Sequence, residues 1–109
     1  MPEFAFIFRP TRAVKPDDLP SRNAAAREWA LARRKEGTLR AASPLEEGGV
    51  TVSQDCVAPI TAVHAVGAVL VLEVQDLDAA VALAKTHPGL AYGTEIEVRP
   101  VKAVAPATP

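Results

Sequence analysis

The sequence has too few cysteines for a disulfide-linked protein. It also lacks the long apolar segments of a membrane protein and the basic runs of a nucleic-acid-binding protein. Its single cysteine, Cys56, excludes an intramolecular disulfide and favours a reducing compartment, so we expect a cytoplasmic protein. The first ten residues lack a basic stretch, and Arg9 interrupts their short apolar run, so we expect neither a signal peptide nor a membrane span. The formal net charge of −1 provides no general attraction for nucleic acid or an anionic membrane.

Motifs for metals and cofactors are missing as well. The two histidines and the cysteine stand at scattered positions without the spacing of a zinc site. The sequence contains no phosphate-binding loop, dinucleotide fingerprint, nucleophile elbow or zinc-protease motif. We therefore expect neither a metal nor a cofactor.

What the sequence does contain is typical of one small globular domain. It has 109 residues, of which 49% are hydrophobic and 23% charged. We expect a single domain over residues 1–101. Residues 102–109 hold too little apolar surface to order themselves and are predicted to form a flexible tail.

Strict alternation predicts strands at the two ends of this domain. In residues 3–9 one side carries three phenylalanines and the other carries Ala5, Ile7 and Arg9. In residues 94–101, Ile96 and Val98 lie on one side, with Glu95, Glu97 and Arg99 on the other.

Two helices are predicted between these strands. Ser21 is a candidate N-cap for a helix that ends near Glu36, with Gly37 just beyond it and Trp29 as its main packing residue. Asp76 is placed to cap a second helix over residues 77–86, whose apolar residues recur at helical spacing.

The middle of the chain predicts further strands. Residues 38–45 and 49–53 flank a glycine-containing turn and suggest a hairpin, with residues 54–61 as a loop. Residues 62–74 are almost continuously apolar, which predicts a strand covered on both faces, with Gly67 as a bulge or kink.

With the hairpin taken as an insertion, the order of elements predicts an α+β fold of the ferredoxin-like β-α-β-β-α-β type. In this fold both helices cover one face of an antiparallel sheet. The second face is also apolar, and the chain offers no further helix to cover it. A second copy of the chain is the simplest cover, so we expect a homodimer with a ligand space between two sheets.

Three segments resemble the YCII-related, or DGPF-domain, family of small bacterial proteins. They are GGVTV at residues 48–52, the apolar strand that ends in VLEV, and DLDAAVALAKTHPGLAYGTEIEVRPV at residues 76–101. The resemblance implies a dimeric α+β barrel, a fold shared with small ring-modifying enzymes that need no cofactor.

Two family features are missing. Where the family carries Asp-Gly-Pro-Phe, this chain reads DCVAP and keeps only Asp55 and Pro59. Family members thought to be catalytic share a His–Asp pair whose histidine follows the first strand. The corresponding segment here, PTRAVKPDDLP, has no histidine, so that pair cannot be carried over.

The strongest candidate binding residues are charges of the terminal strands. Glu97 and Arg99 are neighbours on one strand face, and Arg9 is expected nearby because the first and last strands lie side by side in this topology. They either form a structural ion pair or hold a substrate carboxylate or enolate through the planar guanidinium of Arg99.

Titratable residues supply the other candidates. His64, near the start of the apolar strand, and Asp55 are candidates to move a proton. His87, which precedes a proline, either terminates the second helix or contacts a substrate. Tyr92 is either a core aromatic or a wall of the ligand space. Cys56 has no local activating base and is not expected to act as a nucleophile.

Two functions remain open. The first is a dimeric barrel that binds a small molecule or a partner between its sheets without strong catalysis of its own. The second is a cofactor-free isomerase, lyase or dehydrochlorinase that acts by proton transfer on a carbonyl or ring-derived metabolite.

Overall fold

The computed structural model of the chain describes residues 1–61 and 65–103. The first half contains β1 (Glu3–Pro10), a short 3-10 turn η1 (Pro16–Asp18), α1 (Leu19–Lys35), β2 (Leu39–Pro44), β3 (Val50–Val52) and β4 (Val57–Pro59). The second half contains β5 (Ala68–Glu73), α2 (Leu77–Ala84), η3 (Pro88–Tyr92) and β6 (Thr94–Pro100). Neither described helix has the length and apolarity that a bilayer crossing requires.

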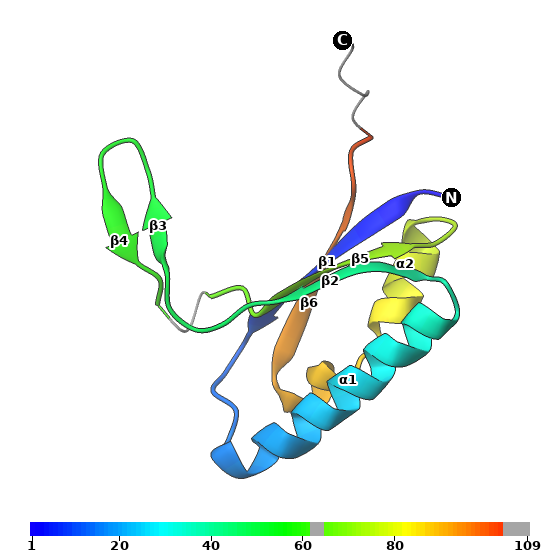
Figure 1. Cartoon of the computed structure of the whole chain (residues 1–109), viewed down its shortest axis with the longest axis horizontal. Helices are drawn as coiled ribbons and strands as arrows, with labels where there is room; N and C mark the ends of the chain where they lie inside the picture. The colour runs from blue at the N-terminus through cyan, green and yellow to red at the C-terminus, as the bar shows by residue number, and fades with distance from the viewer. Residues whose placement is uncertain (62–64, 104–109) are drawn as a thin grey trace.

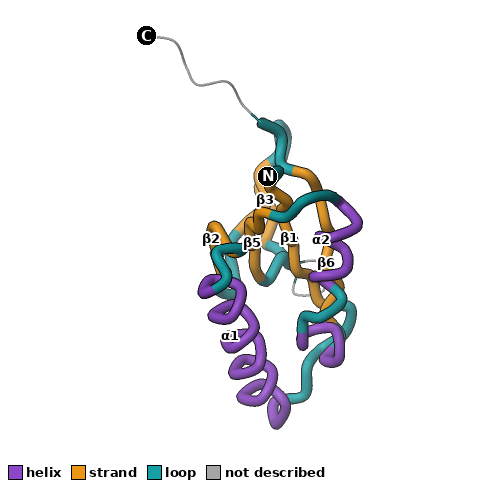
Figure 2. Tube along the Cα trace, turned by 90° about the vertical axis from the view of Figure 1, so that its right-hand side faces the viewer, coloured by secondary structure: helices purple, strands orange, loops and turns teal. Residues whose placement is uncertain are grey.

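Four strands form one antiparallel sheet in the order β2-β5-β1-β6. With β3 and β4 set aside, the chain runs β-α-β-β-α-β, and α1 and α2 both lie on one face of this sheet (Figures 1 and 2). The predicted α+β, ferredoxin-like architecture is therefore confirmed.

The alternation in β1 decides which side chains enter the core. Phe4, Phe6 and Phe8 point toward the helices and are at most 6% exposed, while Ala5 and Ile7 between them stay partly exposed. The core on the helix side is formed by Phe4, Phe6, Phe8, Trp29, Leu39, Leu70, Leu72, Ala80 and Ala84. Ile96 and Val98 of β6 pack against this core, as their alternation predicts.

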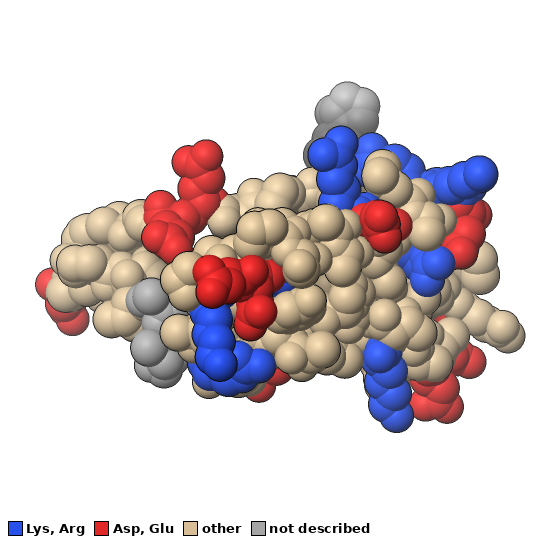
Figure 3. Space-filling view, turned by 90° about the horizontal axis from the view of Figure 1, so that it is seen from below, with Lys and Arg blue, Asp and Glu red and all other residues tan. Residues whose placement is uncertain are grey.

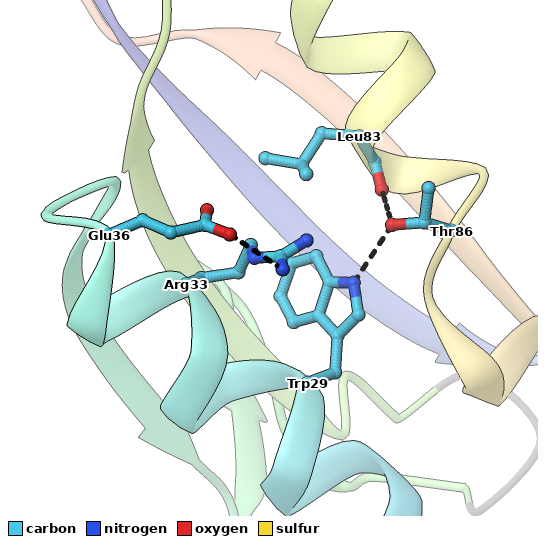
Figure 4. A network of polar contacts seen from close by, with 5 residues as sticks. All are labelled: Trp29, Arg33, Glu36, Leu83 and Thr86. Carbon is cyan, nitrogen blue, oxygen red and sulfur yellow. Dashed lines mark hydrogen bonds and ion pairs between the residues drawn. The ribbon is translucent and has the colours of Figure 1, made fainter.

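A series of polar contacts connects α1 to the C-terminal end of α2 (Figure 4). The indole N–H of Trp29 donates to Oγ1 of Thr86 at 2.9 Å, and that hydroxyl donates to the carbonyl of Leu83 at 2.6 Å. The guanidinium of Arg33 lies 5.4 Å from the Trp29 ring and also contacts Glu36 at 2.9 Å. Trp29, the buried residue of α1, thus fixes this helix to the segment after α2.

The predicted start of the first helix was wrong. α1 begins at Leu19 with Asp18 as its N-cap, so Ser21 lies inside the first turn, which tolerates Pro20 because its N–H groups need no helical partner. The predicted end is confirmed. Gly37 adopts a φ of 81°, and the N–H groups of Gly37 and Thr38 bond back to the carbonyls of Arg34 and Arg33.

The predicted hairpin was also wrong in its partners. β2 pairs with β5 in the main sheet, whereas β3 pairs with β4, in the segment expected to be a loop. The backbone N–H of Ser53 donates to the carbonyl of Cys56 at 2.8 Å and closes the turn between β3 and β4.

The long apolar strand is shorter than predicted. β5 covers only Ala68–Glu73, and helices cover only the face that carries Leu70 and Leu72. Gly67 precedes the strand instead of kinking it, and its N–H donates to the carbonyl of Phe8 at 2.8 Å. Residues 62–64 of the predicted strand and residues 104–109 of the predicted tail lie outside the described part of the chain.

The second helix and its surroundings largely follow the prediction. The Asp76 carboxylate caps α2 by accepting the N–H of Ala79 at 2.8 Å. α2 ends at Ala84, two residues before the predicted end, and the 3-10 helix η3 then leads the chain into β6.

Candidate functional site

The face of the sheet opposite the helices, here called the open face, has an apolar centre. Ala5 and Ile7 of β1 lie beside Val71 and Val69 of β5, respectively, and all four side chains are partly exposed. Described helices cover only the other face of the sheet (Figure 1). Aliphatic groups left exposed to water on one face of a sheet favour association with another surface.

A cluster of three charged residues borders this apolar centre on the β6 side. The Arg9 guanidinium contacts the Glu97 carboxylate at 2.8 Å, and the Arg99 guanidinium lies 3.9 Å from the second oxygen of the same carboxylate. Glu97 stands opposite Ile7, and Arg99 stands opposite Ala5. The charges and the apolar centre therefore share one surface, because side chains two residues apart project to the same face.

The two arginines of this cluster differ in their partners. Arg9 makes the short contact with Glu97 and exposes 33% of its side chain, whereas Arg99 makes the long contact and exposes 68%. An exposed ion pair at such a length contributes little to stability. The guanidinium of Arg99 thus remains available to an anion. Its parallel N–H groups can donate two hydrogen bonds to a carboxylate, or bind the oxygen of an enolate.

A second ion pair at the β2–β5 side was not expected from the sequence. Arg40 contacts Glu73 at 2.6 Å, and the N-terminal amine lies 3.7 Å from the other oxygen of that carboxylate. The pairing depends on the register of β2 on β5, which is interrupted between Leu39 and Ala41. No local pattern in the sequence signals it.

His87 lies on the helix side of the sheet, away from the charged cluster. It is 8% exposed, and its ring centroid lies 4.7 Å from that of Phe8 and 4.8 Å from that of Trp29, edge to face with both. Its Nδ1 accepts the N–H of Gly89 at 2.9 Å, so His87 caps η3. Burial lowers the pKa of His87 from 6.5 to about 4, which keeps the ring neutral at pH 7.

Two other described candidates, Tyr92 and Asp55, do not join the charged cluster. Tyr92 is the last residue of η3 and is partly buried. Asp55 lies in the exposed turn between β3 and β4, next to the exposed thiol of Cys56. His64 lies outside the described residues. Of the residues predicted for the site, the structure brings together Arg9, Glu97 and Arg99.

A groove on the helix side of β6 is a second concave surface. Its volume is about 340 Å³. Its lining is aliphatic apart from one lysine and comprises Val81, Ala84, Lys85, Leu90, Ile96 and Val98. The groove lies on the helix side of the sheet, and the charged residues of the open face do not line it. Among residues 1–61 and 65–103, no three His, Cys, Asp or Glu side chains gather as a metal site would require.

Comparisons with known proteins bear on the fold alone. No family model and no curated protein matches the chain. Among solved structures, the chain is similar to the 5-chloro-2-hydroxyhydroquinone dehydrochlorinase (TftG) from Burkholderia phenoliruptrix AC1100, in its complex with 2,5-dihydroxybenzoquinone. The TM-score is 0.50 and the identity 17%, over 86% of this chain and 90% of that chain.

This likeness agrees with the architecture that the sheet order establishes. The resemblance to the YCII-related family remains a prediction, because no family model matches. The chain is an α+β protein with a ferredoxin-like sheet, an inserted hairpin and one face that its helices leave open.

Proposed function

We propose that the chain binds a small anionic molecule between the open faces of two of its copies. The observation that carries this proposal is the position of Arg99, an exposed guanidinium beside the apolar centre of the open face. An apolar wall with one charged anchor suits a small ring or chain that carries a carboxylate or an enolate.

The apolar centre of the open face supports the dimer. Ala5, Ile7, Val69 and Val71 form a continuous strip across β1 and β5, which a second sheet would remove from water. Two copies related by a twofold axis would bring identical strips together. Each charged cluster would then lie at the edge of the enclosed space.

Binding is better supported than catalysis because the described residues place no free acid or base at the cluster. The Glu97 carboxylate is held by Arg9, the imidazole of His87 is on the far side of the sheet, and Asp55 is in the β3–β4 turn. The enzyme function would require a proton-moving group from elsewhere, for which His64 remains a candidate.

The likeness to a dehydrochlorinase justifies testing the enzyme function directly. Purified chain is incubated with 5-chloro-2-hydroxyhydroquinone, and chloride release is measured against a sample without protein. Chloride release that His64→Ala abolishes and Lys35→Ala preserves would favour the enzyme over the binding protein. Absence of release above the protein-free rate supports binding alone.

The binding proposal is tested with 2,5-dihydroxybenzoquinone and benzoate as probes, by isothermal titration calorimetry. Arg99→Ala should weaken binding about tenfold or more, since a hydrogen bond to a charged group contributes about 1.5–3 kcal/mol. Arg34→Ala, which removes an exposed arginine from the last turn of α1, is the matched control and should bind like the wild type. Equal affinity for the wild type and Arg99→Ala, or no binding of either probe, would contradict the proposal.

The dimer is tested by sedimentation velocity. Val71→Arg places a charge in the middle of the apolar strip, so it should yield a monomer with unchanged far-ultraviolet circular dichroism. A wild-type chain that sediments as a monomer at 100 µM, a concentration chosen for the assay, would remove the dimer and with it the enclosed site.

A further inference from the structure

The hairpin of β3 and β4, with the residues that lead into and out of it, stands away from the core. We call residues 45–60 the arm. In Figure 1 the arm rises beyond the end of the sheet, on the side of the sheet that the helices do not cover. Its backbone is closed on itself by the β3–β4 ladder and by the N–H of Ile60, which donates to the carbonyl of Gly49 at 3.3 Å.

Many of the large aliphatic side chains that the protein exposes to solvent lie in the arm. Its exposed aliphatic residues are Leu45 (52%), Val50 (55%), Val52 (70%), Val57 (64%) and Ile60 (38%). A two-stranded hairpin is barely stable in water by itself, so one that displays its valines gains stability by packing against another surface. The arm's own domain does not bury these side chains.

Two glycines form a bend within the arm, just before β3. Gly48 and Gly49 have φ values of 101° and 92°, in the left-handed region that residues with a side chain rarely adopt. Two consecutive glycines in this conformation set the bend between β2 and β3. These two residues are suited to that bend, whereas the position of the arm relative to the core depends on the tertiary structure.

The arm also differs in charge from the remainder of the chain. It contains Glu46, Glu47 and Asp55, and no lysine or arginine occurs between Arg40 and Lys85. The arm therefore carries a formal charge of −3, and because the whole chain carries −1, the remainder carries +2. In Figure 3 the end of the molecule that holds the arm shows acidic and uncharged atoms but no basic ones.

We infer that the arm packs against a second copy of this chain and forms part of the dimer interface. This inference rests on the dimer of the proposed function. The arm rises on the side where a second sheet would lie, it presents aliphatic side chains that need a cover, and its charge is opposite to that of the remainder of a partner copy. The arm thereby adds contact area outside the sheet faces and narrows access to the space between them.

An arm-deletion variant tests this inference by sedimentation equilibrium. Residues 50–59 are replaced by two glycines, which can close the chain because Gly49 and Ile60 are already hydrogen-bonded neighbours. The deletion should raise the dimer dissociation constant at least tenfold. Thr51→Ser, a small change on β3, is the control and should dimerise like the wild type. An unchanged dissociation constant for the deletion variant overturns the inference.

Cross-linking of the full-length chain gives a second readout that does not depend on the folding of the deletion variant. Cys56 is the only cysteine, is exposed, and lies at the tip of the arm, so it accepts a maleimide–benzophenone label selectively. Labelled chain is mixed with a large excess of unlabelled ¹⁵N-enriched chain and left until the subunits have exchanged, so that most labelled chains have a ¹⁵N partner, and is then irradiated and digested. Mixed-isotope cross-links should dominate, whereas cross-links confined to single chains overturn the inference.

The Val71→Arg variant distinguishes an error in the arm inference from an error in the proposed dimer. If Val71→Arg dissociates the dimer and the arm deletion does not, the proposed function stands and the arm inference fails. If the wild type is a monomer, both fail together. If both variants weaken the dimer and the mixed-isotope cross-links form, the arm inference is supported.

Discussion

Acidification should destabilise this protein through His87. The imidazole is buried between the rings of Phe8 and Trp29, and its Nδ1 accepts the backbone N–H of Gly89, so the folded chain requires its neutral form. Protonation would bury a charge and remove the acceptor of that hydrogen bond. Burial accordingly lowers the pKa of His87 from 6.5 to about 4.

The sign and size of the effect follow from this shift. Because the pKa is lower in the folded state, the unfolded chain binds more protons between pH 6.5 and pH 4, and stability falls as the pH decreases through this window. The contribution is complete above pH 6.5. About 2 kcal/mol should be lost between pH 7 and pH 5, and about 3 kcal/mol in total once the pH is below 4.

Urea unfolding at fixed protein concentration, followed by the fluorescence of Trp29, measures this loss. Trp29 is the only tryptophan and lies beside His87. His87→Asn is the control, because a side-chain oxygen can still accept the Gly89 N–H but does not titrate. The other ionisable groups are shared by the two proteins and cancel in the comparison. Equal pH dependence for the wild type and His87→Asn between pH 7 and pH 5 would refute the reasoning.

Two further substitutions test the contacts that hold the helices and β6 in place. Thr86→Val removes the acceptor of the Trp29 indole N–H and should lower the free energy of unfolding by about 1 kcal/mol in urea titrations, whereas Thr86→Ser should retain most of it. Gly93→Ala should destabilise by more than Gly37→Ala in thermal unfolding. Both glycines have φ values near 80°, but a Cβ at Gly93 would lie 2.5 Å from an arginine side chain and one at Gly37 would meet nothing within 4 Å. Equal losses for the two alanine variants would contradict this comparison.

The positions of the charged cluster could be predicted from the sequence because they depend on a local rule. Alternation in β1 and β6 places Arg9, Glu97 and Arg99 on the face opposite the phenylalanines, whichever strands become their neighbours. The contact between Arg9 and Glu97 then requires only that the first and last strands pair, as they do in this topology.

The strand partners in the middle of the chain could not be predicted in the same way. β2 has no alternating pattern, and β3 and β4 have only three residues each, so the local sequence does not select one pairing over another. Register between such strands is decided by contacts far apart in the sequence. The sequence therefore predicts the wrong partner for the hairpin and does not predict the arm.

The sequence by itself determined the local features of this protein: the faces of the two terminal strands, the cap of α2 at Asp76, the end of α1 at Gly37 and the role of Trp29 as a packing residue. Each depends on residues within a few positions of one another or on a single large apolar side chain.

Only the tertiary structure decided the environment of His87, the ion pair of Arg40 with Glu73 and the separation of the arm from the core. These features join residues that are distant in the sequence. Whether such residues come into contact depends on how the helices pack on the sheet and on the strand register. Both are determined by the free energy of the whole folded chain and not by any short segment.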